Sequence, residues 1–438
     1  MRATRARLFV AGAAALAGAA LMAVTTAGAG DVPAGGQTEF DILIGPQVPL
    51  TQSYSQTVQG DYTAAGVGMR NVGGGTISIA LPAGSTIERA FLYWSIIRTP
   101  AGVAPNTGTL NGAPIAGALV GTSGSPCWPT FGSADLVDSF RADVTGIAVD
   151  GANTLTGFPS GLTDNSPPPS APAAFPLLEG ATLVVVFENA AYDVNTIVIR
   201  DGTQTFANQP VSTAFGSFTA APGSAADQAA QTSYVVADGQ AIFPGDRAGF
   251  NGTFVAGPGT ALKPVDAFDG ADGIVPVSAT NGLWDTLNVD VSSFFAPGVS
   301  TAATTEVDAT LSSDCLTYVA QVLSVKTRSV EGLDIKPGSL PNSIKLTNRG
   351  VIPIALLGSA TFDATLLDLS TIEFAGDTTE AHGRVHIQDV NGDGFLDAVL
   401  HFDTQETNIA PGDTEACLTG ELTNGVAFIA CDSVRPIA

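Results

Sequence analysis

The run Ala181-Thr-Leu-Val-Val-Val-Phe187 is apolar at all but one position and carries no charge. Seven residues are too few for a core helix, but they match the usual length of a strand. The three consecutive valines also suit a pleated sheet better than a helix. Because both faces of the run are apolar, we expect a central strand that is covered on both sides.

Runs of the same kind recur along the chain, and they are bounded by Gly, Pro, Asn and Asp. The clearest are residues 76–81, 91–97, 196–199, 287–291 and 316–325. One short helical turn is expected at residues 133–140. The pattern otherwise predicts an all-β protein, with a large jelly-roll or β-sandwich domain followed by a smaller Ig-like β-sandwich module.

The composition agrees with many strands joined by turns. Glycine and proline (50 and 27 of 438 residues) make up about 18% of the chain, against about 12% on average. The 41 acidic residues outnumber the 17 lysines and arginines, which gives a formal net charge of −24. With so little basic surface to neutralise phosphates, the chain is not expected to bind nucleic acid or anionic lipid.

The first 29 residues have the pattern of a secretory signal peptide. Arg2, Arg5 and Arg7 precede an apolar run at residues 8–24, and Ala27-Gly28-Ala29 offers a small-x-small cleavage pattern. A membrane anchor is the alternative, because the run is nearly long enough to span a bilayer. Its weakly hydrophobic Ala and Gly favour cleavage after Ala29. We therefore expect an extracellular protein without a membrane span, either released or associated with the cell surface.

Secretion bears on the four cysteines, because an even number in an oxidising compartment predicts disulfides. Cys417 and Cys431 are equidistant from Asn424, which lies in a predicted hairpin turn at residues 423–425. That spacing would place the two opposite each other on paired strands. We therefore predict a Cys417–Cys431 disulfide, which leaves Cys127 to pair with Cys315.

A domain boundary is expected near residues 328–341, where the last long strand of the first series ends. It divides the chain into a large domain at residues 30–331 and a smaller module at residues 332–438. All three histidines of the chain lie in the second part.

The segment from Asp389 to Asp397 has the spacing of a calcium loop. Asp389, Asn391, Asp393 and Asp397 place side-chain oxygens at its first, third, fifth and ninth positions. Gly394 allows a sharp turn at the sixth, and Phe395 can offer its backbone carbonyl at the seventh. Calcium takes six to eight oxygen ligands of these kinds. We expect Ca²⁺ here; the alternative is a metal-free hairpin turn, because the EF-hand's final glutamate is replaced by Leu400.

Two other groups of polar residues are weaker candidates, for calcium and for zinc respectively. Asp266, Asp269 and Asp272 are spaced by three residues, which matches no standard calcium loop, so a solvated turn is expected. His382 and His386 would lie about 13 Å apart in one strand. They would share a metal ion only if the chain turned at Gly383, so we expect ordinary strand histidines.

The sequence supplies no recognised catalytic motif. It lacks a G-x-S-x-G elbow, a P-loop and a dinucleotide fingerprint, and the large domain has no histidine to act as a base. A glycosidase needs only two carboxylates, which 41 acids can provide. Among the tryptophans, Trp94 is expected in the core, Trp284 fits either environment, and Trp128 is the better candidate for ligand contact.

Two resemblances add to this interpretation. The motifs Leu333-Asp-Ile-Lys-Pro-Gly-Ser339, Asp389-Val-Asn-Gly-Asp-Gly394 and Cys431-Asp-Ser-Val-Arg435 resemble an uncharacterised C-terminal β module of bacterial secreted and cell-surface proteins. Its acidic loop is similar to the calcium loops of dockerins and thrombospondin repeats. Residues 58–328 resemble large β-sandwich domains of unknown function in microbial surface proteins. These resemblances imply an extracellular, structural or adhesive role.

The sequence therefore favours a secreted, calcium-stabilised structural, adhesive or binding protein without catalytic activity. Its partner would be a cell-surface or extracellular glycan or protein. The alternative is a polysaccharide-active enzyme, or a carbohydrate-binding protein, with an appended calcium-binding module. Two carboxylates about 5–10 Å apart in a cleft beside Trp128 or Trp284 would favour the enzyme.

Overall fold

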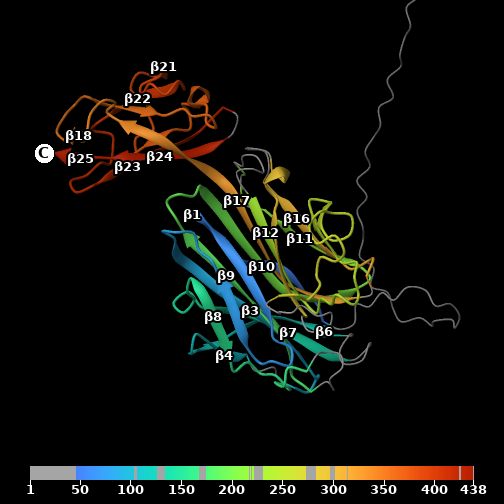
Figure 1. Cartoon of the computed structure of the whole chain (residues 1–438). Helices are drawn as coiled ribbons and strands as arrows, with labels where there is room; N and C mark the ends of the chain where they lie inside the picture. The colour runs from blue at the N-terminus through green and yellow to red at the C-terminus, as the bar shows by residue number, and fades with distance from the viewer. Residues whose placement is uncertain are drawn as a thin grey trace, which may run out of the picture. The chain divides into compact units, whose positions relative to one another are not determined.

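The computed structural model describes most of the chain after residue 45. The described residues are 46–102, 106–125, 134–166, 174–216, 218, 220, 230–272, 283–295, 301–312, 314–423 and 426–437. The predicted signal peptide, Cys127 and Trp128 lie outside them. Within them the chain is built from strands, and two single-turn 3-10 helices, η2 (Ser292–Phe294) and η3 (Ala364–Leu366), are its helical elements (Figure 1). The all-β prediction is confirmed.

The strands fall into two groups along the chain. We call residues 46–331 the large region, and its strands are β1 (Val48–Gly68), β2 (Gly75–Ile79), β3 (Thr86–Arg98), β4 (Thr107–Leu110), β5 (Ala113–Ala116), β6 (Ala118–Ser125), β7 (Asp135–Asp143), β8 (Gly151–Thr156), β9 (Leu177–Glu188), β10 (Val194–Ala207), β11 (Pro210–Phe215), β12 (Ala230–Ala237), β13 (Arg247–Phe250), β14 (Thr253–Ala256), β15 (Trp284–Asp290), β16 (Ala303–Asp308) and the first part of β17 (Cys315–Ile335). We call residues 332–437 the module, and its strands are the end of β17, β18 (Ser343–Lys345), β19 (Val351–Leu356), β20 (Glu373–Phe374), β21 (His386–Gln388), β22 (Asp397–Asp403), β23 (Glu415–Glu421), β24 (Ala427–Ser433) and β25 (Arg435–Ile437).

The strand β9 contains the apolar run that predicted the fold. It lies between β1 and β3 and is buried at every residue except the last, Glu188. Leu183 and Val185 join the core on one side of the sheet, whereas Val184 and Val186 join the core on the other. The expectation of a central strand with two covered faces is confirmed.

The long strand β1 links two halves of the main sheet. Its residues pair with β10 as far as Gln59 and with β9 from Gly60 onward. A Cβ atom at Gly60 would lie only 2.0 Å from the carbonyl oxygen of Phe187. A glycine is therefore needed where β1 changes partner, because any side chain would collide with the neighbouring backbone.

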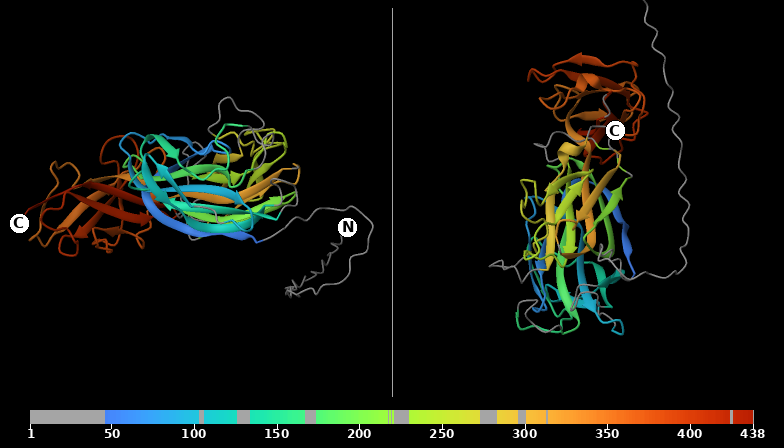
Figure 2. Two further views of the ribbon diagram at one scale, coloured as in Figure 1. Left: turned by 90° about the horizontal axis from the view of Figure 1, so that it is seen from below. Right: turned by 90° about the vertical axis from the view of Figure 1, so that its right-hand side faces the viewer.

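Two smaller sheets cover the main sheet and complete a layered sandwich (Figure 2). The sheet β2-β8-β4-β5 shares an apolar core with β3 and β9, which includes Ile77 and Trp94. The sheet β11-β16-β13-β14 shares another with β10, β12 and β17, which includes Phe250 and Tyr234. A third core, which includes Tyr62 and Trp284, joins the two halves of the main sheet. Sheets packed face to face are the defining feature of a β-sandwich.

The helical turn expected at residues 133–140 is wrong. Residues Asp135–Asp143 instead form β7, which pairs with β3 on one side and β6 on the other. Its residues from Val137 to Phe140 are all buried. Burial on both faces removed the alternation that marks a strand in sequence, and the ladder bonds with two neighbours decided the conformation.

The predicted boundary between residues 331 and 332 falls inside β17. The strand pairs with β10 and β12 before this point, and with β19 and β24 near and beyond it. The module nevertheless has an apolar core of its own, formed between Leu333 and Val434. Among the described residues, this core is separate from the apolar cores of the large region.

The disulfide predicted in the module is confirmed. Cys417 on β23 stands directly opposite Cys431 on β24, with their Cα atoms 4.1 Å apart, and the two are bonded. Cys315 is also disulfide-bonded. Its predicted partner, Cys127, lies outside the described residues, so the Cys127–Cys315 pairing stays a prediction.

Candidate functional site

The predicted calcium loop connects β21 to β22 at an exposed end of the module (Figure 1). Its acidic side chains accept hydrogen bonds from the loop's own backbone. The two carboxylate oxygens of Asp389 accept from the amides of Gly392 (2.7 Å) and Gly394 (3.1 Å). An oxygen of Asp393 accepts from the amide of Phe395 at 2.9 Å. The loop is therefore already wrapped around its carboxylates.

Asp397 lies at the base of this loop and is fully buried. One of its carboxylate oxygens accepts from the amide of Val390 at 2.7 Å, and the other from the amide of Gly358 at 2.9 Å. Both oxygens are thus occupied by backbone donors. Asp397 holds the two ends of the loop together and fastens them to the segment after β19.

The side chains that precede Asp397 are open to solvent. Asp389, Asn391, Asp393 and Phe395 are all exposed. The four oxygen-bearing residues lie within one short segment, with Asp397 buried at its base. However, no choice of one oxygen from each of the three carboxylates places all three within 4.8 Å of one another. Two other groups of metal-ligating side chains among the described residues do meet this distance. A calcium ion would have to draw these carboxylates together.

The first of those two groups is formed by the three histidines. One ring nitrogen each of His382, His386 and His401 lies within 4.8 Å of the other two. The ring centroids of His382 and His401 are 4.2 Å apart, and that of His386 is 5.8 Å and 5.7 Å from theirs. The expectation that His382 and His386 lie about 13 Å apart in one strand is therefore wrong.

Two local features bring the histidines together. The chain turns at Gly383, which has a φ of 63° and donates its amide to the carbonyl of Glu380. Next, His386 pairs with Val399 in the antiparallel ladder of β21 and β22. His401 lies two residues beyond Val399, so it projects from the same face of the sheet as His386.

Glu380 anchors the histidine group through the backbone. Its side chain is only 2% exposed. Its two carboxylate oxygens accept from the amides of His401 (2.9 Å), His382 (2.7 Å) and Arg384 (3.1 Å). Glu380 Oε1 also lies 3.6 Å from His401 Nδ1, which is too long for a hydrogen bond. This carboxylate therefore fixes the backbone of two of the three histidines.

The electrostatics of the group favour a neutral imidazole at His401. Partial burial, followed by the neighbouring His382, lowers the pKa of His401, while Glu380 opposes that shift. A neutral imidazole has a free nitrogen lone pair, which is the form that a metal ion can bind.

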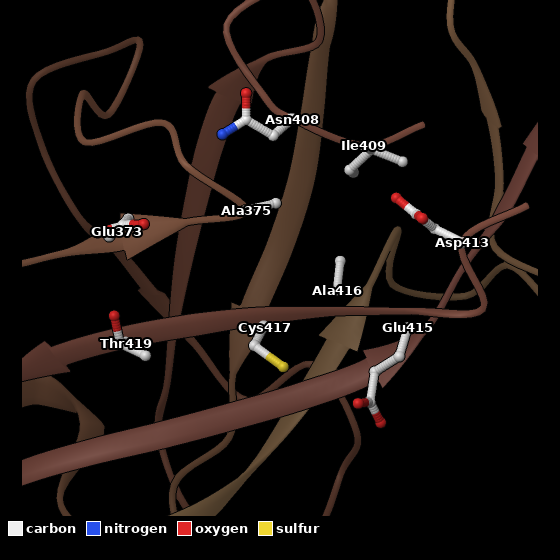
Figure 3. Close-up of a pocket in the computed structure, with 9 residues that line it drawn as sticks. All are labelled: Glu373, Ala375, Asn408, Ile409, Asp413, Glu415, Ala416, Cys417 and Thr419. Atoms are coloured by element: carbon white, nitrogen blue, oxygen red, sulfur yellow. The ribbon is translucent and has the colours of Figure 1, made fainter. Parts of the chain in front are cut away.

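The second group consists of Glu415, Cys417 and Cys431. The disulfide between the two cysteines removes their thiolates, so this group cannot hold a metal ion through sulfur. Glu415 and Cys417 also line a pocket of about 350 Å³ beside β20 and β23 (Figure 3). Carboxylates of Glu373 and Asp413 border it too, but no described lining residue is aromatic.

The tryptophans that the structure describes offer no platform for a sugar ring. Trp94 is fully buried, as expected, and packs against Phe140 and Phe158. Trp284 is also fully buried, and its Nε1 donates to Thr182 Oγ1 at 2.8 Å. The ligand contact predicted for Trp128 stays a prediction, because that residue lies outside the described part of the chain.

The acidic stretch at residues 266–272 is not a solvated turn. Asp266 is 5% exposed, and one of its oxygens accepts from the amide of Asp246, which is itself fully buried. Ser312 donates to the Oδ1 atom of Asp246. Burial raises the pKa of Asp246 to about 8 and that of Asp266 to about 6. Asp269, in contrast, forms an ion pair with Lys263 at 2.7 Å.

Comparisons with known proteins assign neither a family nor an activity to this chain. No family model matches the chain, and no curated protein matches it. A solved structure of a β-porphyranase of glycoside hydrolase family 86 from Bacteroides plebeius aligns with a TM-score of 0.18 and 9% identity, covering 65% of this chain and 37% of that one. The major capsid protein P2 of bacteriophage PM2 aligns with a TM-score of 0.18 and 10% identity, covering 60% and 97%.

The glycoside hydrolase domain of Endo-D from Streptococcus pneumoniae R6 aligns with a TM-score of 0.13 and 13% identity, covering 56% of this chain and 33% of that one. This chain thus spans about a third of the length of each hydrolase chain. Alignments with such low scores assign no activity.

In the described residues there is no helix of the length and apolarity needed to cross a membrane.

Proposed function

We propose that this protein is a secreted, calcium-stabilised extracellular protein whose role is structural, adhesive or binding rather than catalytic. The observation that carries the proposal is the loop from Asp389 to Asp397. Its oxygen-bearing residues have the spacing of a calcium loop, and backbone amides already orient Asp389 and Asp393. Hard cations such as Ca²⁺ select this set of carboxylate, amide and carbonyl oxygens.

Calcium would act here by stabilising the folded module. Three exposed or loop-bound carboxylates in one short segment repel one another, and a divalent ion neutralises them. An ion that binds only the folded state raises the free energy of unfolding by mass action. The affinity typical of extracellular calcium modules, about 10⁻⁴–10⁻³ M, suffices for occupancy at millimolar calcium.

The proposed partner is a cell-surface or extracellular glycan or protein. Both tryptophans that the structure describes are fully buried, which supports a structural or protein-binding role over stacking on sugar rings. A binding screen of the whole chain against immobilised glycans and against cell-wall proteins distinguishes these partners.

The calcium proposal is tested by thermal unfolding of metal-free protein with and without added Ca²⁺. At a calcium concentration ten times the Kd, the expected gain in the free energy of unfolding is about 1.4 kcal/mol. The variant Asp389→Asn/Asp393→Asn keeps a hydrogen-bond acceptor at each position but removes both charges. It should lose the calcium-dependent gain.

A matched control is Asp368→Asn. This residue is half-buried in the same module and accepts hydrogen bonds from Ser370, but it lies outside the loop. It should respond to calcium as the unmodified protein does. Mg²⁺ should stabilise both proteins less than Ca²⁺ does. An equal calcium response in the loop variant and in the control would show that the loop is not the calcium site.

A further inference from the structure

We propose that His382, His386 and His401 form a second metal site in the module, which binds a transition-metal ion of the Zn²⁺ type through three imidazoles and leaves one coordination position open. This site is independent of the calcium loop, because it uses nitrogen donors. Imidazole suits zinc and its neighbours in the first transition row, whereas calcium requires oxygen ligands.

The geometry of the three rings is close to what a tetrahedral ion needs. Zinc binds imidazole nitrogen at about 2.0–2.1 Å, so two ligands of a tetrahedron lie about 3.4 Å apart. The three nitrogens already lie within 4.8 Å of one another. The strand register fixes the backbone of His386 and His401, so rotation of the side chains is the movement that would bring the nitrogens to this spacing.

Two ring nitrogens of the group have no partner. His386 Nε2 and His401 Nδ1 are buried from solvent, and neither forms a hydrogen bond within the described part of the chain. Buried polar atoms are normally satisfied, because leaving one unpaired costs free energy. Unpaired nitrogens on two adjacent rings, beside a third ring, are the arrangement expected of a site that a metal ion completes.

The surroundings supply what metal-ligating histidines usually have. Buried carboxylates next to such histidines fix the ligands and strengthen their binding. Glu380 holds the backbone amides of His382 and His401 rather than their rings, and its Oε1 lies 3.6 Å from His401 Nδ1. His382 is the exposed member of the group. The fourth position of the ion therefore faces solvent, where a water molecule or an outside donor can bind.

These are the only three histidines of the chain, so any histidine signal or histidine-dependent zinc binding comes from this group. The whole chain is purified with a histidine-free affinity tag and stripped of metal. Zinc is then titrated against a chromophoric chelator, and Co²⁺ is used as a coloured substitute. We expect one Zn²⁺ per chain and the intense visible absorption of tetrahedral Co²⁺. In NMR spectra, all three imidazoles should shift together at one equivalent of zinc.

Variants separate this site from the calcium loop. His386→Ala and His401→Ala should each weaken zinc binding by more than about 100-fold. That is the largest loss expected when only a residue hydrogen-bonded to a ligand is removed. Asp389→Asn/Asp393→Asn should bind zinc as the unmodified chain does. Conversely, the histidine variants should keep the calcium response, which also shows that they are folded.

Three results would overturn the proposal. One is the absence of zinc binding to the unmodified chain at micromolar zinc. Another is a zinc stoichiometry unchanged in the triple variant His382→Ala/His386→Ala/His401→Ala. The third is loss of zinc binding in Asp389→Asn/Asp393→Asn with the histidine variants unaffected, which would place the ion in the acidic loop. Failure of the calcium proposal alone leaves all of these zinc results unchanged.

Discussion

The large region and the module each contain a group of ionisable side chains, and these two groups lie in opposite surroundings. In the large region Asp246, Asp285 and Asp314 are at most 1% exposed. In the module, Asp389 and Asp393 lie on an exposed loop, and the three histidines gather on a turn and two strands near the surface. The first set is closed off from dissolved ions, whereas the second can be reached by them.

This difference in access changes the chemistry of the same kind of side chain. Burial raises the pKa of Asp246 to about 8, and it raises the pKa values of Asp285 and Asp314 as well. Such carboxyls tend to keep their protons and bind cations poorly. In the module, Asp389 and Asp393 also accept hydrogen bonds from backbone amides, but their side chains stay exposed to solvent. The buried carboxyls of the large region therefore suit a structural framework. The exposed loop and the histidines of the module are accessible to ions.

The largest expected effect tests whether the framework is independent of the module. Trp94→Ala removes a fully buried ring that packs on Phe140 and Phe158. Replacing a buried aromatic residue by alanine costs about 3–5 kcal/mol, because it leaves a cavity. We expect the unfolding transition of the large region to shift to lower temperature, while the NMR signals of the three histidines keep their own transition.

Trp94→Phe is the control, because it fills much of the same volume and should cost less. The strand β17 belongs to both regions. If the histidine signals melt together with the large region in Trp94→Ala, the two regions unfold as one unit and the comparison fails.

A smaller effect is expected in the module alone. Cys417→Ala/Cys431→Ala removes a disulfide between residues 14 apart in sequence. In the chain-entropy model, closing a loop of about 15 residues contributes about 3 kcal/mol, so the free energy of unfolding of the module should fall by about that amount. Chemical denaturation followed by the histidine NMR signals measures it.

Thr419→Ala, on the same strand two residues away, is a control for side-chain loss without loss of the cross-link. An equal change in the transition of the large region would mean that the disulfide does not act on the module alone.

Local sequence was enough to predict the features that depend on near neighbours. The run at residues 181–187 predicted β9, and the symmetry of Cys417 and Cys431 about Asn424 predicted their bond. Each of these needs only strand periodicity or the length of one hairpin. The acidic loop from Asp389 to Asp397 was also identified by its spacing, and its calcium binding stays a prediction.

Features that depend on register between strands could not be predicted in this way. The histidine group requires His386 to stand opposite Val399, and a shift by one residue would turn His386 to the other face. The burial of Asp266 depends on its packing against Asp246, which lies 20 residues earlier in the chain. A charged side chain gives no local signal that distant strands will cover it.

The smallest expected effect concerns the pH dependence of the large region. The pKa of Asp246 is raised from 3.8 to about 8, first because of burial and then because of the nearby Asp266 and Asp308. The folded state therefore holds this proton more tightly than the unfolded state does. Stability from this group is fully present below about pH 4, declines as the pH rises, and is lost above about pH 8.

Asp246→Asn separates this effect from other titrations, because asparagine stays uncharged at every pH while Ser312 can still donate to it. One proton bound only in the folded state contributes a slope of up to about 1.4 kcal/mol per pH unit. Between pH 6 and pH 8 the unmodified chain should therefore lose stability faster than Asp246→Asn, since Asp266, with a pKa of about 6, titrates mainly below this window. The variant Asp368→Asn, in the module, should follow the unmodified chain. The pH profiles are measured by urea unfolding. Parallel profiles for all three proteins would mean that Asp246 is ionised in the folded state. The contrast between a buried framework and an exposed module would then not hold for this carboxylate.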